Sequence, residues 1–235
     1  AINQYDAELI LRDVRFGASS YAAVAYTNNP DKYCDDEPVM ATYAASDVEM
    51  SYCNGIEEAG AFAAGMQASK VIPTYKHFPG LGRVKDNTDT SAGVVDSTTT
   101  RLPDAAVGVF ANAIAAGAPV IMVSSATYSL IDPSAPAVFS STIVTDMLRR
   151  EMGFSGVVIT DDVSAAVQVQ DVSAGDRAVR AIRAGCDLVL ASADPTVAAD
   201  MVKALIATAR SDPAFAARVD ESATRVLNLK KSLQS

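Results

Sequence analysis

The sequence predicts an α/β fold in which parallel strands alternate with helices, and three observations indicate it. From about residue 70 onward, short apolar and β-branched runs alternate with longer segments of helical periodicity. The short runs are apolar throughout, which is typical of strands that helices cover on both faces. Polar side chains follow each run directly, at the point where the carboxyl ends of parallel strands meet.

Four such runs are expected to be strands, and each is followed by a helical segment. In chain order they are VIPTYKHF (71–78), PVIMVSSA (119–126), SGVVITDD (155–162) and CDLVLAS (186–192). Upstream, residues 50–69 have the composition of a helix that leads into the first strand. Earlier still, AELILRD and YAAVAYT are candidate strands, and NNPDKYCDDEP is a candidate loop.

Capping residues mark the helices between these strands. Side chains that can accept a hydrogen bond from a free backbone N–H stand where each helix should begin. The candidate N-caps are Asp104 after Pro103, Ser140 or Ser141, Ser173, and Asp194 before Pro195. Glycines suited to the ends of the first three helices are Gly117, Gly153 and Gly185. Residues 213–233 predict one or two closing helices, and TYSLIDPSAPAVF (127–139) is predicted to be a loop.

Charge and composition exclude several classes of function. The formal net charge is −9, so nucleic-acid binding is not expected, because an acidic surface repels phosphate. No apolar run reaches the roughly 20 residues of a membrane helix, so no membrane span is expected. The basic pairs Arg149-Arg150 and Lys230-Lys231 are interpreted as solvated helix ends.

Histidine and cysteine usage is restrictive. His77 is the single histidine, and none of the three cysteines stands in a CxxC motif. A zinc site of common spacing is therefore not expected, and no metal or cofactor is predicted. Cys186 lies in an apolar strand entry and is predicted to be a buried thiol. Cys34 and Cys53 can form a disulfide if the protein is exported or can be two free thiols, and both interpretations stay open.

Polar pairs at the strand ends are the candidate functional residues. Lys76-His77, Ser124-Ser125 and Asp161-Asp162 each end a predicted strand, and Ser192 ends the fourth. In a parallel barrel these positions line the carboxyl-terminal mouth, where active sites lie. A doubly wound open sheet would also place its ligand at the strand ends, so the pattern alone leaves both architectures open.

Asp161 is the strongest candidate for a chemical role. Adjacent carboxylates on a strand point to opposite sides, so only one of Asp161 and Asp162 can face the mouth. A buried carboxylate is costly unless it is paired, which favours a function, although a loop-capping aspartate is the simpler alternative. A retaining glycosidase needs one ionised carboxylate and one proton donor. Asp161 suits the first role, and the second would come from the loop that holds Asp86, Thr88, Asp89 and Thr90.

The strand tip at Lys76-His77 leads into an unusual turn, KHFPGLG, with Pro79, Gly80 and Gly82. Lysine and histidine at such a tip can hydrogen-bond hydroxyl groups or anions. Equally, Lys76 can be salt-bridged while His77 only packs. A Schiff-base role for Lys76 in an aldolase-like barrel is a further alternative, which borohydride trapping would expose.

Several motifs resemble glycoside hydrolase family 3, in its β-N-acetylhexosaminidase branch. KHFPGLG resembles that branch's KHFPGHG signature, GFSGVVITDDVSA its SDD or TDD segment, and AGCDLVLAS its AG-x-D strand. The resemblance runs from about residue 55 to the end of the chain. It implies a TIM-like (β/α) barrel that cleaves terminal β-N-acetylglucosamine through a covalent glycosyl-enzyme intermediate, often from peptidoglycan fragments. It also assigns Asp161 as nucleophile and Lys76 and His77 as substrate-binding residues.

The loop after the signature departs from the family. The family's Asp-Ser-His acid/base triplet falls on Asn87-Thr88-Asp89, so an aspartate replaces the usual histidine. Asp89 is a candidate carboxylic acid/base, as in most glycosidases. Aligning Asp86 with the family's aspartate instead would leave no acid at the histidine position. The alternative function is therefore a catalytically weak or inactive sugar-binding relative.

The N-terminal side of the barrel is the second departure. The family's D-x-E-G-G segment is not found, and four strands are clear against the eight of a full barrel. The expectation is a single barrel domain over residues 1–235, incomplete on its N-terminal side, which an oligomer could complete with strands from another chain. The expected partner is a carbohydrate substrate. An extracellular or cell-envelope location is expected, with the cytoplasm as the alternative.

Overall fold

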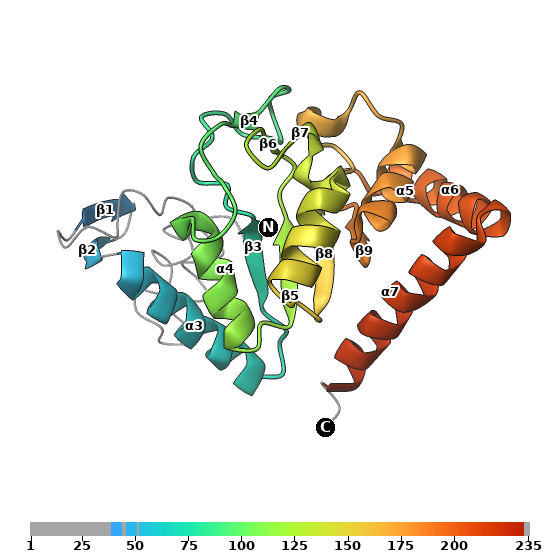
Figure 1. Ribbon diagram of the computed structural model, residues 1–235. Helices are drawn as coiled ribbons and strands as arrows, with labels where there is room; N and C mark the ends of the chain where they lie inside the picture. The colour runs from blue at the N-terminus through green and yellow to red at the C-terminus, as the bar shows by residue number, and fades with distance from the viewer. Residues whose placement is uncertain (1–38, 44–45, 51, 233–235) are drawn as a thin grey trace. The chain divides into compact units, whose positions relative to one another are not determined.

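The computed structural model describes residues 39–43, 46–50 and 52–232, shown as ribbons in Figure 1. The chain divides into two compact units, Ala1–Pro73 and Thr74–Ser235. No helix in the described part of the chain is long and apolar enough to cross a membrane.

The described residues of the first unit form two strands and a helix. β1 (Val39–Tyr43) pairs with β2 (Ser46–Met50) in antiparallel register. α3 (Tyr52–Ala68) follows and confirms the helix predicted upstream of the first strand. The earlier candidate strands and the candidate loop lie outside the described residues, as does Cys34, so a Cys34–Cys53 disulfide stays a prediction.

A four-stranded parallel sheet forms the centre of the second unit (Figure 1). Its order is β3 (Thr74–Phe78), β5 (Val120–Val123), β8 (Val157–Asp162) and β9 (Leu188–Leu190). All three pairings are parallel. The four predicted strands and their parallel arrangement are therefore confirmed. The carboxyl ends of all four strands consequently lie along one edge of the sheet.

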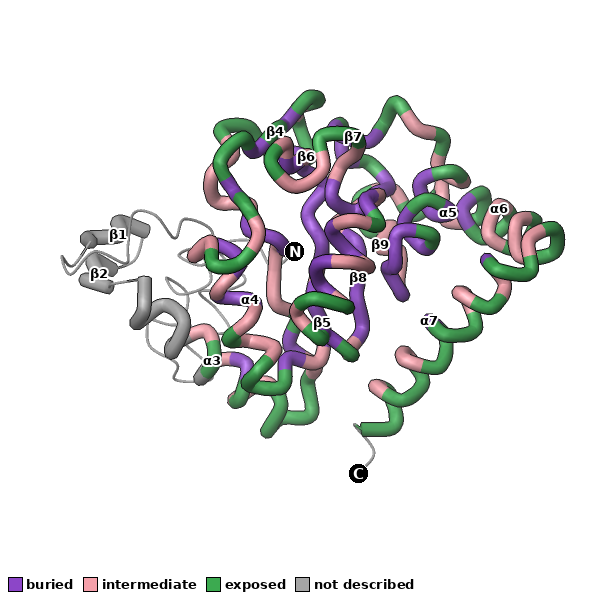
Figure 2. The backbone as a smooth tube through the Cα atoms, in the orientation of Figure 1, coloured by how far each residue is buried: buried purple, intermediate pink, exposed green. Residues whose placement is uncertain are grey.

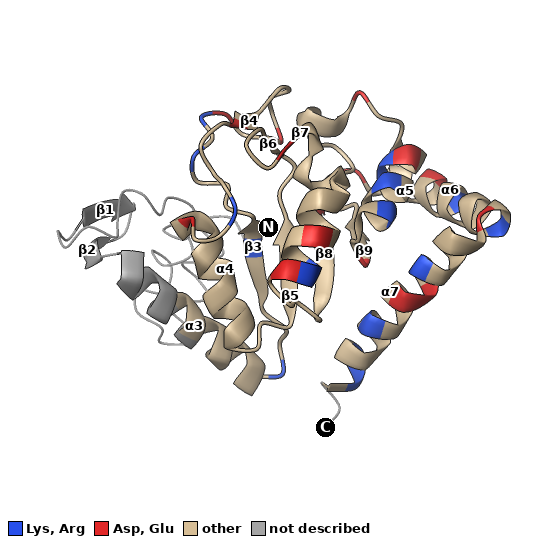
Figure 3. Ribbon diagram, in the orientation of Figure 1, with Lys and Arg blue, Asp and Glu red and all other residues tan. Residues whose placement is uncertain are grey.

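A helix follows each of these strands in the predicted order, and further helices close the chain after β9. They are α4 (Ala105–Ala115), the π-helical η3 (Thr142–Glu151), α5 (Ala174–Ala184), the short η5 (Pro195–Val197), α6 (Ala198–Ser211) and α7 (Pro213–Ser232). Figure 3 shows basic and acidic residues interspersed along α7.

The predicted caps are in place. The side chains of Asp104, Ser173 and Asp194 accept hydrogen bonds from the backbone N–H groups of the first turns. For η3 the cap is Ser140, because its Oγ accepts from the N–H of Ile143 at 3.1 Å, whereas the Ser141 side chain makes no cap bond. Sequence alone left the two serines open, since both stand at the right distance from the helix.

The core lies along the two central strands. Val120, Ile121 and Val123 of β5 and Val157 and Val158 of β8 are at most 5 % exposed. Figure 2 shows this buried stretch in purple, with exposed positions on the outer surfaces of the helices. Both faces of the sheet are covered, as the absence of polar alternation in the strands predicts.

The predicted loop at residues 127–139 is partly wrong. It contains β6 (Thr127–Tyr128), β7 (Asp132–Pro136) and the short helix η2 (Ala137–Phe139). β6 joins β4 (Val95–Asp96) in parallel and β7 in antiparallel register, which makes a second, three-stranded sheet. The two-residue strands β4 and β6 are too short to show alternation of polar and apolar residues, and two prolines make β7 untypical of a strand. This sheet therefore forms through long-range pairing rather than local sequence pattern.

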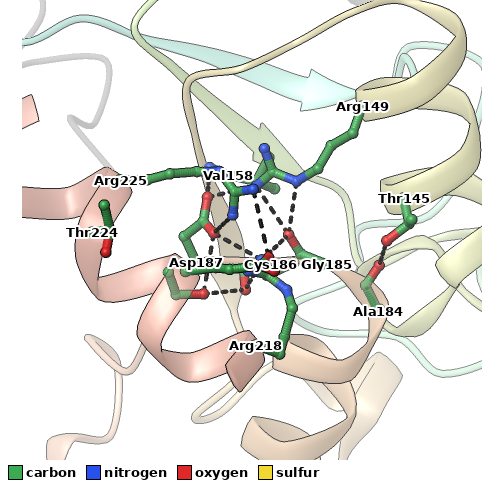
Figure 4. Close-up of polar contacts among 12 residues, drawn as sticks. Thr145, Arg149, Val158, Ala184, Gly185, Cys186, Asp187, Arg218, Thr224 and Arg225 are labelled. Atoms are coloured by element: carbon green, nitrogen blue, oxygen red, sulfur yellow. Dashed lines mark hydrogen bonds and ion pairs between the residues drawn. The ribbon is translucent and has the colours of Figure 1, made fainter. Parts of the chain in front are cut away.

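The interpretation of Arg149 as a solvated helix end is also wrong. Its side chain is 12 % exposed, and its guanidinium binds Asp187, whose side chain is completely buried at the amino end of β9 (Figure 4). Arg218 and Arg225 of α7 bind the same carboxylate at 2.8 and 3.1 Å. We name these four residues the Asp187 cluster. Asp187 also accepts the backbone N–H of Val158, so the cluster joins α7 and η3 to the sheet.

Candidate active site

The β3 tip is fixed by a turn that only glycine fits. The Gly80 N–H donates to the His77 carbonyl at 2.8 Å, and Gly80 has a φ of +135°. A Cβ added there would lie 2.8 Å from the Cβ of Ala106, so a side chain would both strain the backbone and meet α4. The buried Tyr128 hydroxyl donates to the Gly80 carbonyl at 3.1 Å, which locks the turn from the side of β6. The Lys76–His77 and Phe78–Pro79 peptide bonds are cis.

His77 faces Asp161. Its Nε2 lies 3.9 Å from the Asp161 Oδ2, and each side chain is 16 % exposed. Burial, with the charge of Lys76 as a smaller cause, lowers the pKa of His77 to about 3. The imidazole is therefore neutral at pH 7, so its contact with Asp161 is not an ion pair. Among the residues that the structure describes, the buried Nδ1 of His77 has no hydrogen-bond partner.

Asp161 is a largely but not completely buried carboxylate at the end of β8, with a raised pKa. Burial raises its pKa to about 6, and the negative charge of Asp89 acts in the same direction. The backbone N–H of Asp162, which donates to the Asp161 Oδ1 at 2.8 Å, and the charge of Lys76 oppose the shift. Asp161 is thus mostly ionised at pH 7 and incompletely compensated, which suits a nucleophile.

Asp162 has the loop-capping role that sequence weighed for either aspartate. Its Oδ1 accepts from the N–H of Ser164, and its Oδ2 accepts from the N–H groups of Ser192 and Ala193 at 2.8 and 2.7 Å. Burial alone would raise its pKa, but the hydrogen bonds from Ser164 and Ala193 outweigh it and lower the pKa to about 2. The two adjacent carboxylates therefore have separate partners, as their alternation along the strand predicts.

Asp89 lies on the polar loop 83–104, and its side chain is exposed. Its N–H donates to the Asn87 Oδ1 at 2.7 Å, so the residue at the family's aspartate position caps the turn. The Asp89 carbonyl accepts from the N–H of Val167 at 3.2 Å, which places the turn beside the segment that follows β8. The charge of Asp89 raises the pKa of Asp161, so the two carboxylates interact electrostatically.

The other sequence candidates have mixed positions. Asp86 and Thr90 are exposed, whereas Thr88 is only 3 % exposed and faces the interior. Ser124 and Ser125 are completely buried, and the Ser124 Oγ accepts from the N–H of Ala126 at 3.0 Å. Ser124 therefore supports the β5 tip, whereas the buried Ser125 Oγ has no hydrogen-bond partner among the described residues.

Sequence reasoning missed Tyr128 and Gln168. Both are buried polar side chains that hydrogen-bond backbone groups of the loops beside Asp161. Tyr128 stands in a segment interpreted as a loop, and Gln168 stands between two valines in a short apolar stretch. The polar residue inside that apolar stretch is the one signal that indicates a buried hydrogen bond. In the described part of the chain, no group of three or more His, Cys, Asp or Glu residues is arranged to hold a metal ion.

A family model, the N-terminal domain of glycosyl hydrolase family 3, matches residues 54–229. The chain belongs to glycosyl hydrolase family 3. Among its relatives is an uncharacterized secreted glycosyl hydrolase of Arthroderma benhamiae, 33% identical over 178 residues, which are 74% of this chain and 50% of the relative. A β-hexosaminidase of Nitrosomonas eutropha is 33% identical over 149 residues, or 63% of this chain and 42% of the relative.

Solved structures of similar proteins share the fold of this chain. The β-N-acetylhexosaminidase of Beutenbergia cavernae is 58% identical with a TM-score of 0.74, over 76% of this chain and 52% of that one. The β-N-acetylglucosaminidase of Thermotoga maritima, at 21% identity, has a TM-score of 0.68 over 93% of this chain and 49% of that one, which shows a shared fold. The chain thus spans about half the length of the relatives it matches.

The family and fold predictions are therefore confirmed. The chain lies in the family 3 branch that includes these β-hexosaminidases, and its fold is of the TIM-like (β/α) barrel type. The β3-β5-β8-β9 sheet is the parallel strand layer of that fold among the described residues. Its carboxyl ends carry Lys76, His77 and Asp161, at the edge where such barrels hold their active sites.

Proposed function

We propose that the protein hydrolyses terminal β-N-acetylglucosaminides, or related β-glycosides, with retention of configuration. The observation that carries the proposal is the largely buried carboxylate of Asp161 at a strand tip, where it faces a neutral His77. The charge of Asp89 raises the pKa of this carboxylate. A retaining glycosidase needs such a pair of carboxyl groups. The β-hexosaminidases among the relatives support the choice of sugar.

The reaction proceeds in two displacements. In the first, the Asp161 carboxylate forms a bond to the anomeric carbon while the bond to the leaving oxygen breaks, and Asp89 gives that oxygen its proton. In the second, Asp89 takes a proton from water, the water oxygen bonds to the anomeric carbon, and Asp161 is released. The configuration inverts twice and is thereby retained.

Lys76 and His77 hold the sugar in this proposal. A neutral imidazole offers one N–H donor and one nitrogen acceptor, so His77 can bind a hydroxyl group without cancelling the negative charge of Asp161. Lys76 carries a positive charge and lowers the pKa of Asp161, which favours the ionised nucleophile. Fragments of peptidoglycan that end in N-acetylglucosamine are the proposed natural substrates.

The second candidate function is sugar binding without efficient turnover. The observation that favours it is the exposed Asp89 in place of the family's histidine, with Asn87 in place of its orienting aspartate. The histidine that serves the family as acid/base and the aspartate that orients it are thus both absent from this loop. The two functions differ in whether the protein cleaves glycosides with poor leaving groups.

The location of the protein and its oligomeric state are also proposals. An extracellular or cell-envelope location is supported by the relative described as secreted. An oligomer that completes the barrel remains a proposal, and the mass in solution by light scattering tests it. A protein that stays monomeric at working concentration and still cleaves substrate would overturn it.

The deciding experiment is turnover of 2,4-dinitrophenyl N-acetyl-β-glucosaminide by the wild type and Asp161→Asn. This leaving group hardly needs an acid, so the assay tests the nucleophile alone. We expect the variant to lose at least about 10³-fold in kcat/KM, since it removes the covalent step. Asp171→Asn, an exposed aspartate on the same β8–α5 connection, is the matched control and should keep wild-type turnover.

Trapping distinguishes a covalent route from binding. A 5-fluoro-N-acetylglucosaminyl fluoride should add its glycosyl mass to the peptide that holds Asp161 in the wild type and in Asp171→Asn. No adduct and no turnover, with N-acetylglucosamine still bound, would establish the binding function instead.

A further inference from the structure

The Gln168 side chain binds both the backbone N–H and the carbonyl of Val94. Val94 lies in the polar loop 83–104 that carries Asp89, which we name the Asp89 loop. Gln168 lies on the short helix η4 (Val167–Val169), and its side chain is buried. The N–H of Val94 donates to the Gln168 Oε1 at 2.8 Å, and the Gln168 Nε2 donates to the Val94 carbonyl at 3.2 Å. The amide is therefore fixed in one orientation, because the Val94 N–H needs the amide oxygen and the Val94 carbonyl accepts from the amide nitrogen.

The backbone of the same helix holds the turn that carries Asp89. The N–H of Gln168 donates to the Thr88 carbonyl at 3.1 Å, and the N–H of Val167 donates to the Asp89 carbonyl at 3.2 Å. With the two bonds to Val94, four hydrogen bonds join η4 to the loop. Both Thr88 and Val94 are 3 % exposed, so the loop presents a buried side to η4.

η4 is in turn braced against the nucleophile strand. The Ser164 side chain donates to Asp162, and the Ser164 carbonyl accepts from the Gln170 Nε2 at 3.0 Å and from the Arg177 Nη1 at 3.1 Å. The segment from Asp162 to η4 therefore has its polar groups tied at both ends. A group attached to η4 is held at a fixed place relative to Asp161.

The loop is also stiff within itself. Asp96 is 1 % exposed and accepts from the backbone and hydroxyl groups of Thr98 and Thr99. At the base of the loop, Arg83 binds Asp104 at 2.9 Å. A loop that keeps its own shape moves as one piece, so its docking onto η4, together with the pairing of β4 with β6, sets where Asp89 lies.

We propose that Gln168 is a positioning residue for the glycosidase reaction, and that it docks the Asp89 loop onto the connection that follows the nucleophile strand. One stretch of chain thereby sets the positions of both carboxyl groups. The inference rests on the proposed function, because it assigns Gln168 a role through the proton donor Asp89. Without the amide, the buried N–H of Val94 loses its partner, although the Val94 carbonyl still accepts from the N–H of Thr127 at 3.0 Å. An unpaired buried N–H is costly, so this part of the loop gains by lifting into water.

The test compares a good and a poor leaving group. We expect Gln168→Leu to lose about 10- to 100-fold in kcat/KM on 4-methoxyphenyl N-acetyl-β-glucosaminide, part of the contribution that a general acid makes. On the 2,4-dinitrophenyl substrate it should lose less than about threefold, because that leaving group needs no proton. Adding Gln168→Leu to Asp89→Ala should cost nothing further, since the group that it positions is gone.

Ser222→Ala is the matched control. It also removes a buried side-chain hydrogen bond, at 3.1 Å to Asp187, but at the amino end of β9. It should affect both substrates equally. Equal losses on the two substrates by Gln168→Leu, or a loss multiplied on top of Asp89→Ala, would overturn the positioning role.

Hydrogen exchange separates failure of this inference from failure of the proposed function. The Val94 amide should be protected in the wild type and in Ser222→Ala, and should exchange at least about tenfold faster in Gln168→Leu as the loop opens. Unchanged protection overturns the docking whatever the kinetics. A third outcome is that protection is lost as expected while Asp89→Ala loses the same factor in kcat/KM on both substrates. That result overturns the acid/base role of Asp89, and the positioning role of Gln168 with it.

Discussion

Asp161 and Asp187 are aspartates at opposite ends of strands of the same sheet, the first largely and the second completely buried, yet their surroundings are opposite. Asp187, at the amino end of β9, meets three guanidinium groups, which hold its pKa below the usual value against the effect of burial. Asp161, at the carboxyl end of β8, meets a neutral histidine, and burial raises its pKa to about 6. A buried carboxylate whose charge is fully balanced by cations stabilises the fold. A carboxylate whose charge is only partly balanced stays available for chemistry.

The largest effect that tests this difference is expected from removing the charge of Asp187. Asp187→Asn leaves the guanidinium groups of Arg149, Arg218 and Arg225 without their shared anion in a buried place. The free energy of unfolding should fall by about 3–5 kcal/mol. Urea denaturation followed by circular dichroism measures it.

A surface pair gives the control for that measurement. Asp146→Asn breaks an ion pair with Arg150 in which both side chains are well exposed, and should cost no more than about 0.5 kcal/mol. Equal effects of the two substitutions would show that the Asp187 cluster is no more than a set of surface contacts.

The same substitution at Asp161 should have the opposite sign at pH 7. Its folded pKa is above the unfolded value, so the folded state binds the proton more tightly, and this contribution is present below pH 3.8 and lost as pH rises through about 6. Asp161→Asn should therefore stabilise the protein at pH 7 by up to about 3 kcal/mol. Thermal denaturation at pH 4 and pH 7 measures the difference, which should nearly vanish at pH 4. Destabilisation at pH 7 would mean that the carboxylate has partners that compensate it.

Kinetics sharpen the comparison further. Only the ionised Asp161 attacks, so kcat/KM on the dinitrophenyl substrate should fall about tenfold per pH unit below pH 6. Asp187, whose pKa is lowered, should contribute nothing to the profile in this range. A flat profile between pH 5 and pH 7 would contradict the raised pKa of Asp161.

The smallest expected effect concerns the turn beside His77. Tyr128→Phe removes the hydrogen bond to the Gly80 carbonyl and should cost about 1 kcal/mol in unfolding free energy. KM should rise more than kcat falls, because the turn positions the sugar-binding tip. A tenfold loss in kcat with an unchanged KM would assign Tyr128 to the chemical step instead.

Sequence predicts the parts of this molecule that local patterns determine. The four parallel strands, the caps at Asp104, Ser173 and Asp194, and the buried thiol of Cys186 follow from periodicity, hydrogen-bonding side chains and apolar context. Their interactions lie within a few residues of the chain, or depend only on burial.

The rest depends on partners that are far away in sequence. Arg149 looks like any cation in a last helical turn, and only the fold brings it to Asp187, 38 residues later. Gln168 meets Val94 across 74 residues. Of the candidate site, the sequence indicates Asp161 and His77 by their position at strand ends, but it does not show that His77 is neutral or that Asp162 caps the neighbouring loop.

Cys186 gives the protein an internal probe of its own opening. The thiol is 0% exposed, next to Asp187, and burial with the nearby Asp187 charge raises its pKa to about 12. Thiolate is the form that reacts with alkylating reagents, so the native thiol should be almost inert. Its labelling, read as a mass change on the peptide that holds it, would therefore time the openings that expose the thiol, whose Sγ lies 3.9 Å from the Val138 carbonyl of η2.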